Sequence, residues 1–167
     1  IRSVYGKSKI ITFTKSDWRA KRKFAGGGIL LDQGIHLLDL LTFFVGDFKF
    51  FKSFISNKFW KYDVEDNAFA LMKNKKGVIA SIHSTATQWQ HKFMMEITFE
   101  KCLMVLSGIL SGSKSYGKES LVIVPRKDIN NNKFKKIKKF FFNKDNSWKD
   151  EVDEFADIIL NNKKVKT

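Results

Sequence analysis

The run that decides the fold is Gly26-Gly27-Gly28-Ile29-Leu30-Leu31-Asp32-Gln33-Gly34-Ile35-His36-Leu37-Leu38-Asp39-Leu40-Leu41, because it places polar side chains inside the most apolar stretch of the chain. In a helix, Asp32, His36 and Asp39 fall at i, i+4 and i+7 and form one polar stripe among isoleucine and leucine. An apolar surface all round predicts a buried helix. A carboxylate and an imidazole that are buried one turn apart are costly without partners, which favours a functional role over an incidental one.

The length and composition predict a single domain over residues 1–167. The chain is 43% hydrophobic and contains 17 Phe and 4 Trp, which is enough to build a core without disulfides. Cys102 is the only cysteine, so a disulfide framework is excluded and a reducing, cytoplasmic compartment is favoured. The apolar run 29–45 is about long enough for a membrane span, but four polar residues interrupt it. We therefore expect a core helix and no membrane association.

The formal net charge of +14 invites a nucleic-acid interpretation. The chain has few arginines, however, and they are Arg2, Arg19, Arg22 and Arg126. Base readout and bidentate phosphate recognition favour arginine, whereas the abundant lysines are scattered over the whole sequence. We interpret the charge as a lysine-rich, solvated surface that can attract an anionic substrate, and we expect no nucleic-acid partner.

The periodicity predicts two helices with a run of strands between them, and one further strand before the first helix. The first helix is expected over 28–44, after a polar connection at 15–25, and Gly46 ends it as a C-terminal glycine does. The second is an amphipathic helix over 147–160 with Ser147 as its N-cap. A loop is expected over 107–119 and a turn at 130–132. Strands are predicted at 9–14, 48–57, 66–73, 77–87, 92–99, 103–106, 121–125 and 137–142.

Short turns between consecutive strands indicate antiparallel hairpins. The fold class is therefore α+β, with a large, open-faced, predominantly antiparallel sheet and helices packed on one face. Part of the uncovered face is expected to be apolar because phenylalanine is so frequent. Such a face predicts self-association, as a homodimer or tetramer, through the open side of the sheet.

The pattern Gly26-Gly27-Gly28-x-Leu30-x-Asp32-x-Gly34-x-His36-x-x-Asp39 resembles the signature that opens the second domain of the glucose-fructose oxidoreductase / inositol dehydrogenase / rhizopine-catabolism (Gfo/Idh/MocA) family of NAD(P)-dependent sugar oxidoreductases. The segments 64–71, 76–82 and 84–89 resemble two adjacent strands of the same family, in order and in spacing. Neither the glycine-rich fingerprint of the family's N-terminal Rossmann domain nor its Glu-Lys-Pro motif is found in the sequence. The resemblance implies that this chain is the substrate-side, C-terminal domain alone.

The resemblance also implies an activity and assigns roles. The family exchanges a hydride between NAD or NADP and a secondary alcohol or ketone of a sugar, cyclitol or nucleotide-sugar. His36 resembles the proton donor and acceptor, a task that suits an imidazole near neutral pH, and Asp32 would orient the ring or bind a neighbouring hydroxyl. Gly27 and Gly28 would let the backbone approach the cofactor. Substrate contacts are assigned to Trp18, Arg19 and Gln33.

The missing Rossmann domain limits what is expected of the chain by itself. The cofactor would be bound mainly by that domain, so this chain alone is expected to bind no NAD(P) and to be inactive. The alternative to an enzyme is a non-catalytic module of the same fold that mediates dimerisation through its sheet or binds a ligand.

Several residues keep structural alternatives. By itself, His36 would be interpreted as a core histidine whose ring nitrogens are hydrogen-bonded. The neighbouring Asp32 and the glycine triplet favour a catalytic role instead. Asp39 is interpreted as a local structural partner. His83 and His91 flank a strand end that could face the sugar or lie on the surface. The histidines are not spaced one helical turn apart and no Cys-x-x-Cys is present, so we expect no metal site.

Overall fold

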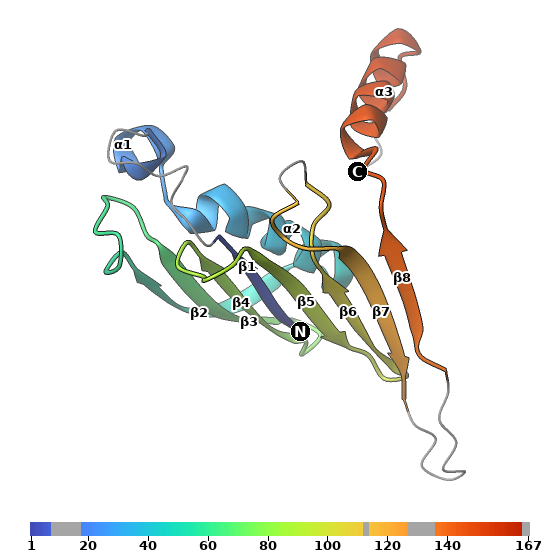
Figure 1. Cartoon of the computed structure of the whole chain (residues 1–167), viewed down its shortest axis with the longest axis horizontal. Coiled ribbons are helices and arrows are strands. Elements are labelled where there is room, and N and C mark those ends of the chain that lie inside the picture. Colours follow the sequence, from blue (N-terminus) through green and yellow to red (C-terminus); the bar gives the residue numbers. More distant parts are fainter. Residues whose placement is uncertain (8–17, 112–113, 127–135, 165–167) are drawn as a thin grey trace.

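The computed structural model describes residues 1–7, 18–111, 114–126 and 136–164 (Figure 1). The strands are β1 (Arg2–Gly6), β2 (Phe48–Ser56), β3 (Asn67–Asn74), β4 (Ile79–Thr85), β5 (Lys92–Thr98), β6 (Cys102–Ser107), β7 (Glu119–Pro125) and β8 (Lys138–Phe142). The helical elements are the 3₁₀ turn η1 (Trp18–Ala20), α1 (Arg22–Ala25), the π turn η2 (Leu30–Gly34), α2 (Ile35–Val45) and α3 (Ser147–Leu160). The predicted strand 9–14 and turn 130–132 lie outside the described residues.

The strands form a single sheet in the order β2-β3-β4-β1-β5-β6-β7-β8. Every neighbouring pair is antiparallel except β1 and β4, which are parallel. The predicted α+β class with an open, mostly antiparallel sheet is confirmed. Strand β1 was not predicted from the sequence; it lies in the middle of the sheet, with Ser3 opposite Ile82 on one side and Met95 on the other. Such pairing between distant segments leaves no local pattern that would predict it.

The core lies between α2 and one face of the sheet (Figure 1). Leu37 and Leu41, one turn apart on α2, are fully buried. They pack against a cluster of sheet residues that alternate along their strands, as a covered face requires. Those residues are Met72, Ala80, Ile82, Met95 and Ile97. Packing of α2 on one face of the sheet is therefore confirmed. The predicted helix α3 forms with Asn146 instead of Ser147 as its N-cap residue, and none of its residues is buried.

The expectation of a helix buried on all sides is wrong. Ile35, His36, Asp39 and Phe43 are exposed on the outer side of α2, and Phe43 is 81% exposed. The sheet can cover only one side of a helix, and no second layer of described residues covers the other. The polar stripe therefore lies at the surface of this chain.

The region before α2 also differs from a regular helix over 28–44. It begins with the π turn η2, which is wider than an α turn and is often found at functional sites. The predicted polar connection contains the short η1 and α1. At the other end, Gly46 has a positive φ of 77° and its N–H bonds to the Thr42 carbonyl, so the predicted glycine stop is confirmed.

By length and composition, Arg22–Val45 could cross a membrane. In the structure this stretch is divided into α1, a glycine turn, η2 and α2, and its central leucines pack on the sheet. This arrangement is typical of a core helix in a globular domain.

The opposite face of the sheet is uncovered and apolar at its β2–β4 end. Its exposed side chains point away from α2 because they alternate with the core residues. They are Phe50, Phe54, Phe69, Leu71 and Ile79, with exposed fractions from 50% to 79%. His83 stacks on Phe69 within this patch, with ring centroids 3.7 Å apart.

We predict that Leu41→Ala destabilises the fold by about 2–5 kcal/mol, because it removes a fully buried side chain from the α2–sheet core. The matched control on the same helix is Phe43→Ala, which should change the free energy of unfolding by less than about 0.5 kcal/mol since Phe43 is exposed. Urea unfolding of the two purified variants measures both. Equal effects would show that α2 packs on the sheet through a different face.

Candidate functional site

One concavity of about 320 Å³ lies where η1, the glycine turn and the start of α2 meet. It brings together six of the seven residues proposed from sequence for catalysis, substrate or cofactor. Its lining is Trp18, Arg19, Ala25, Gly27, Gly28, Leu31, Asp32, Ile35 and His36. Gln33 is the proposed residue that does not line it.

Glu65, in the loop before β3, holds the glycine turn in place. Its carboxylate accepts hydrogen bonds from the N–H groups of Gly28 (2.9 Å) and Leu30 (3.2 Å), and its carbonyl accepts one from Ile29 (3.0 Å). The Ser84 hydroxyl donates to the Ile29 carbonyl at 2.9 Å. The carboxylate therefore satisfies amides at the start of a helix, where a negative charge is favourable.

Gly28 is required by this packing. A Cβ at that position would lie 2.0 Å from the Glu65 carbonyl oxygen. Because Gly28 has no side chain, the backbone of Glu65 can pack directly against it. The Gly28 N–H already donates its hydrogen bond to the Glu65 carboxylate. Gly27 lines the concavity and has only the Leu31 side chain within 3.6 Å of a built Cβ. A role for either glycine toward a cofactor stays a prediction.

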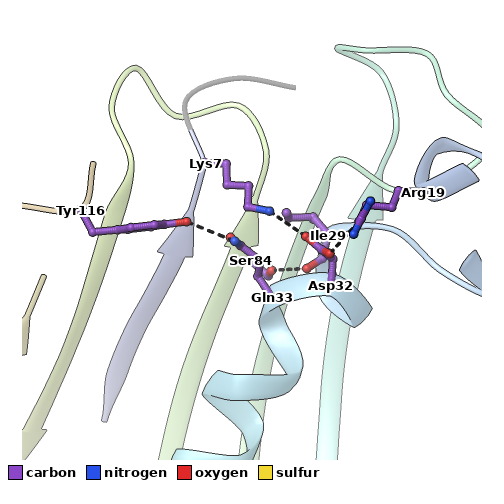
Figure 2. Close-up of polar contacts among 7 residues, drawn as sticks. All are labelled: Lys7, Arg19, Ile29, Asp32, Gln33, Ser84 and Tyr116. Atoms are coloured by element: carbon purple, nitrogen blue, oxygen red, sulfur yellow. Dashed lines mark hydrogen bonds and ion pairs between the residues drawn. The ribbon is translucent and has the colours of Figure 1, made fainter. Parts of the chain in front are cut away.

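Asp32 forms ion pairs with two cations (Figure 2). Lys7 Nζ donates to Asp32 Oδ2 at 2.9 Å, and Arg19 Nε lies 3.8 Å from Oδ1. The side chains of Lys7 and Asp32 are only 17% and 26% exposed, so solvent screens this pair incompletely. Arg19 also lies over the Trp18 ring, 4.4 Å from its centroid. In this chain Arg19 is therefore directed at a carboxylate of its own site.

Lys7 is a site residue that sequence reasoning missed. It follows β1, whose position in the centre of the sheet brings it beside the helix start 25 residues further along the chain. Its backbone N–H donates to the Thr85 carbonyl and its carbonyl accepts from Gln88 N–H, which fixes the segment. Only the sheet order could have revealed this neighbour.

Gln33 points toward the sheet instead of the concavity. It is 6% exposed, and its Nε2 donates to the Tyr116 hydroxyl at 3.1 Å (Figure 2). The Oε1 of Gln33 has no hydrogen-bond partner among the described residues. In this arrangement the π turn aims Gln33 at the tyrosine and Asp32 at the concavity, so the geometry does not favour the predicted substrate contact of Gln33.

Two tyrosines border this cluster. The Tyr5 ring lies 5.5 Å from that of Tyr116 and 6.4 Å from the His36 ring. Burial raises the pKa of Tyr5, and the nearby Tyr116 and Asp32 raise it further. Burial is also the main cause that raises the pKa of Tyr116. Tyrosine is protonated at neutral pH even with its ordinary pKa, and these shifts move ionisation further away from that range, so both hydroxyls can donate hydrogen bonds.

His36 is exposed at the edge of the concavity. Both side chains line the concavity, but no hydrogen bond or ion pair joins His36 to Asp32 in the part of the chain that the structure describes. Asp39 is exposed on the next turn and lies outside the lining, beside a different surface depression. An accessible imidazole next to a fixed carboxylate can exchange a proton with a bound ligand.

The other histidines are separated from this concavity. His83 lies on the open face, where it contacts Asn67 Oδ1 at 3.3 Å, and burial, with Lys92, lowers its pKa. His91 packs against Tyr116, and burial, with Lys7, lowers its pKa. The described residues contain no group of three or more His, Cys, Asp or Glu side chains that could hold a metal ion.

Residues 1–105 match the family model of the GFO/IDH/MocA C-terminal domain. The chain therefore belongs to this family, as its glycine and Asp-x-x-x-His pattern indicated. No curated protein sequence matches it significantly.

Solved structures of the same fold are about twice as long as this chain or longer. A proposed NADPH-dependent oxidoreductase from Desulfitobacterium hafniense has 18% identity and a TM-score of 0.75, and the match covers 99% of this chain and 48% of that one. KijD10, a 3-ketoreductase from Actinomadura kijaniata in complex with NADP and TDP-benzene, has 16% identity and a TM-score of 0.75 over 99% and 46%. A levoglucosan dehydrogenase in complex with NADH and levoglucosan has 18% identity and a TM-score of 0.66 over 84% and 38%. The chain thus spans less than half of each.

We predict that Gly28→Ala lowers the free energy of unfolding by about 1–3 kcal/mol or more, because the new methyl group would overlap the Glu65 backbone. Gly27→Ala is the comparison variant and should have a smaller effect, since its nearest neighbour is the Leu31 Cβ at 3.3 Å, whereas Gly28 has a backbone oxygen at 2.0 Å. Thermal unfolding of both variants checks the difference. A Gly28→Ala protein as stable as the control would contradict the Glu65 packing.

Proposed function

We propose that the intact protein containing this chain is an NAD(P)-dependent oxidoreductase that acts on a secondary alcohol or ketone of a sugar, cyclitol or nucleotide-sugar. This chain supplies the substrate-side domain, residues 1–167. The observation that carries the proposal is the concavity in which the family pattern gathers Asp32 and His36 beside Trp18 and Arg19. The dehydrogenase and ketoreductase activities named for structures of the same fold support it.

An N-terminal nucleotide-binding domain is part of this proposal. The matched structures carry at least as much additional chain as they share with this one, and two of those named above hold NADP or NADH. Within the concavity, Leu31, Ile35 and Trp18 offer apolar contact, but Glu65 occupies the N–H groups of Gly28 and Leu30 that could cradle a phosphate. The residues present fit the substrate and the apolar side of a cofactor. The chain alone would accordingly bind no NAD(P) and show no turnover.

In the proposed reaction, His36 and Asp32 have different roles. The nicotinamide, when bound, accepts or supplies the hydride. His36 takes the hydroxyl proton during oxidation and returns it to the oxygen during reduction, from an exposed position at the edge of the concavity. Asp32, held by Lys7 and Arg19, offers a fixed carboxylate to a neighbouring hydroxyl of the sugar.

We predict that His36→Ala in the intact protein lowers kcat by about 10²–10⁴-fold, the usual contribution of a positioned general acid or base. Cofactor affinity should be unchanged, because His36 belongs to the substrate side. Steady-state kinetics with a panel of sugars and nucleotide-sugars, together with calorimetry for NAD(P), measures both.

The control for this experiment is Asp39→Asn, one turn further along α2 and outside the concavity, which should keep wild-type turnover. Undiminished turnover of His36→Ala would refute the catalytic assignment. An intact protein that transfers no hydride to any sugar tested, yet self-associates, would favour the non-catalytic alternative.

We also propose that a second copy binds the open face of the sheet. The exposed phenylalanines of β2 and β3 surround a groove of about 460 Å³ that Leu71 and His83 also line. A contiguous exposed apolar patch with polar residues around it is typical of a protein–protein interface. A histidine whose pKa is lowered stays neutral at physiological pH and can be buried at such an interface at less cost.

We expect Phe54→Lys to halve the mass of the oligomer, or to shift it toward monomer, because it places a charge at the centre of the groove. Phe59→Lys, at an exposed position in the turn before β3, is the control and should leave the mass unchanged. Analytical ultracentrifugation distinguishes them. A Phe54→Lys protein with the wild-type mass would exclude this face as the interface.

A further inference from the structure

The π turn η2 carries two neighbouring side chains with different surroundings. Asp32 lines the concavity, where it pairs with Lys7 and Arg19. Gln33, the next residue, is 6% exposed, and its Nε2 donates to the Tyr116 hydroxyl at 3.1 Å (Figure 2). Because the two side chains leave adjacent positions of one turn, the placement of Gln33 constrains the placement of Asp32.

The width of this turn decides where its side chains point. π turns are rare and occur mostly as single wide turns inside α-helices, and η2 leads directly into the regular helix α2. If η2 relaxed to the α-helical form, the residues before it would rotate by about 100° relative to α2, which is one residue's share of a 3.6-residue turn. Asp32 lies inside η2, so its direction depends on which form is kept.

Both ends of the turn are held by contacts with neighbouring segments. At its start, the Glu65 carboxylate accepts a hydrogen bond from the Leu30 N–H. At its end, a Cβ on Gly34 would lie 3.0 Å from the Ser84 Cβ, so the backbone packs closely on β4. Between these ends, the hydrogen bond of Gln33 ties the turn to the loop that leads into β7.

Tyr116 is itself fixed by aromatic neighbours. It lies 83 residues from Gln33, in the loop between β6 and β7. Its ring packs edge-to-face against Tyr5 of β1 and against His91, which precedes β5, with centroid distances of 5.5 Å and 4.9 Å. These contacts join the Tyr116 hydroxyl to the centre of the sheet, from where it meets the turn.

The amide of Gln33 depends on that one hydroxyl. Its Oε1 has no hydrogen-bond partner among the described residues, and its Nε2 bonds to Tyr116. Without the hydroxyl, a buried amide would be left with no hydrogen bond to the described part of the chain, which is costly. The turn could relieve that cost by moving Gln33 toward water, and Asp32 would move with it.

We propose that Gln33 and Tyr116 are positioning residues for the proposed reaction. Their hydrogen bond keeps η2 in the π form that directs the Asp32 carboxylate into the concavity. The inference rests on the proposed function, in which that carboxylate binds a sugar hydroxyl beside the one that reacts at His36. Neither positioning residue needs to touch the substrate, so this role differs from the direct substrate contact predicted for Gln33.

The test uses Tyr116→Phe in the intact protein, which removes the hydroxyl and keeps the ring. We expect kcat/KM for the sugar to fall by about tenfold or more, because a misplacement of about 1 Å in a binding group can cost about 10²-fold. Gln33→Met removes the other end of the same bond and should give the same loss. The matched control is Tyr62→Phe, at a partly buried tyrosine outside the lining of the concavity, which should keep wild-type turnover.

A double-mutant cycle with Asp32→Asn separates an indirect role from a direct one. If Tyr116 acts through Asp32, Tyr116→Phe should cost less than about twofold in kcat/KM once Asp32 has been replaced, since coupled residues are not additive. An equal loss in both backgrounds would mean that Tyr116 contacts the substrate or acts by another route. That result would overturn the inference.

Hydrogen exchange adds a readout that does not depend on turnover. In Tyr116→Phe the amides of residues 32–36 should exchange about tenfold faster or more, whereas Tyr62→Phe should keep the wild-type rates. Unchanged exchange in Tyr116→Phe would show that other contacts hold the turn and would also overturn the inference. An intact protein that transfers no hydride to any sugar would refute the proposed function, while the exchange rates would still decide whether Tyr116 holds η2.

Discussion

The arrangement of the site depends on the hydrogen bonds between Glu65 and the glycine turn, which are called the Glu65 clasp below. Two N–H groups donate to its carboxylate and a third donates to its carbonyl, so the start of the helix is tied to the loop that leads into β3. Hydrogen bonds to a charged group contribute about 1.5–3 kcal/mol each. Because a Cβ at Gly28 would collide with the Glu65 backbone, only glycine permits this approach. The clasp sets where Asp32 and His36 stand relative to the sheet.

The electrostatics of the site come from residues that are far apart in sequence. Asp32 would be costly to hold at 26% exposure by itself, and Lys7 and Arg19 offset that cost. The same ion pairs fix the orientation of the Asp32 carboxylate, whereas a carboxylate without partners in water would rotate freely. Nearby, burial raises the pKa of Tyr5 and of Tyr116, and the Tyr116 hydroxyl accepts a hydrogen bond from Gln33. A carboxylate with fixed partners and neutral hydroxyls around it suits recognition of a polyhydroxylated ligand, in line with the proposed function.

The two faces of the sheet have different uses. One face is covered at its centre by α2, and the concavity with its apolar rim lies at the start of that helix. The other is bare, with phenylalanine, leucine and isoleucine exposed on β2, β3 and β4. An exposed apolar face of this kind is typical of a surface that binds a partner. We propose a second copy as the occupant of the bare face.

The sequence by itself determined the elements whose signal is local. Alternation predicted β2 to β8, Gly46 marked the end of α2, and the i, i+4, i+7 spacing of Trp148, Val152 and Phe155 predicted α3. Six of the proposed site residues share the concavity because they lie within one short segment, 18–36, whose own turns bring them together. Only the tertiary structure decided that β1 enters the middle of the sheet, that Lys7 therefore meets Asp32, that Glu65 clasps Gly28, and that the π turn aims Gln33 at Tyr116. Periodicity reports which way each side chain points along its own element, whereas contacts between distant segments depend on the order in which the strands pair, and that order leaves no trace in neighbouring residues.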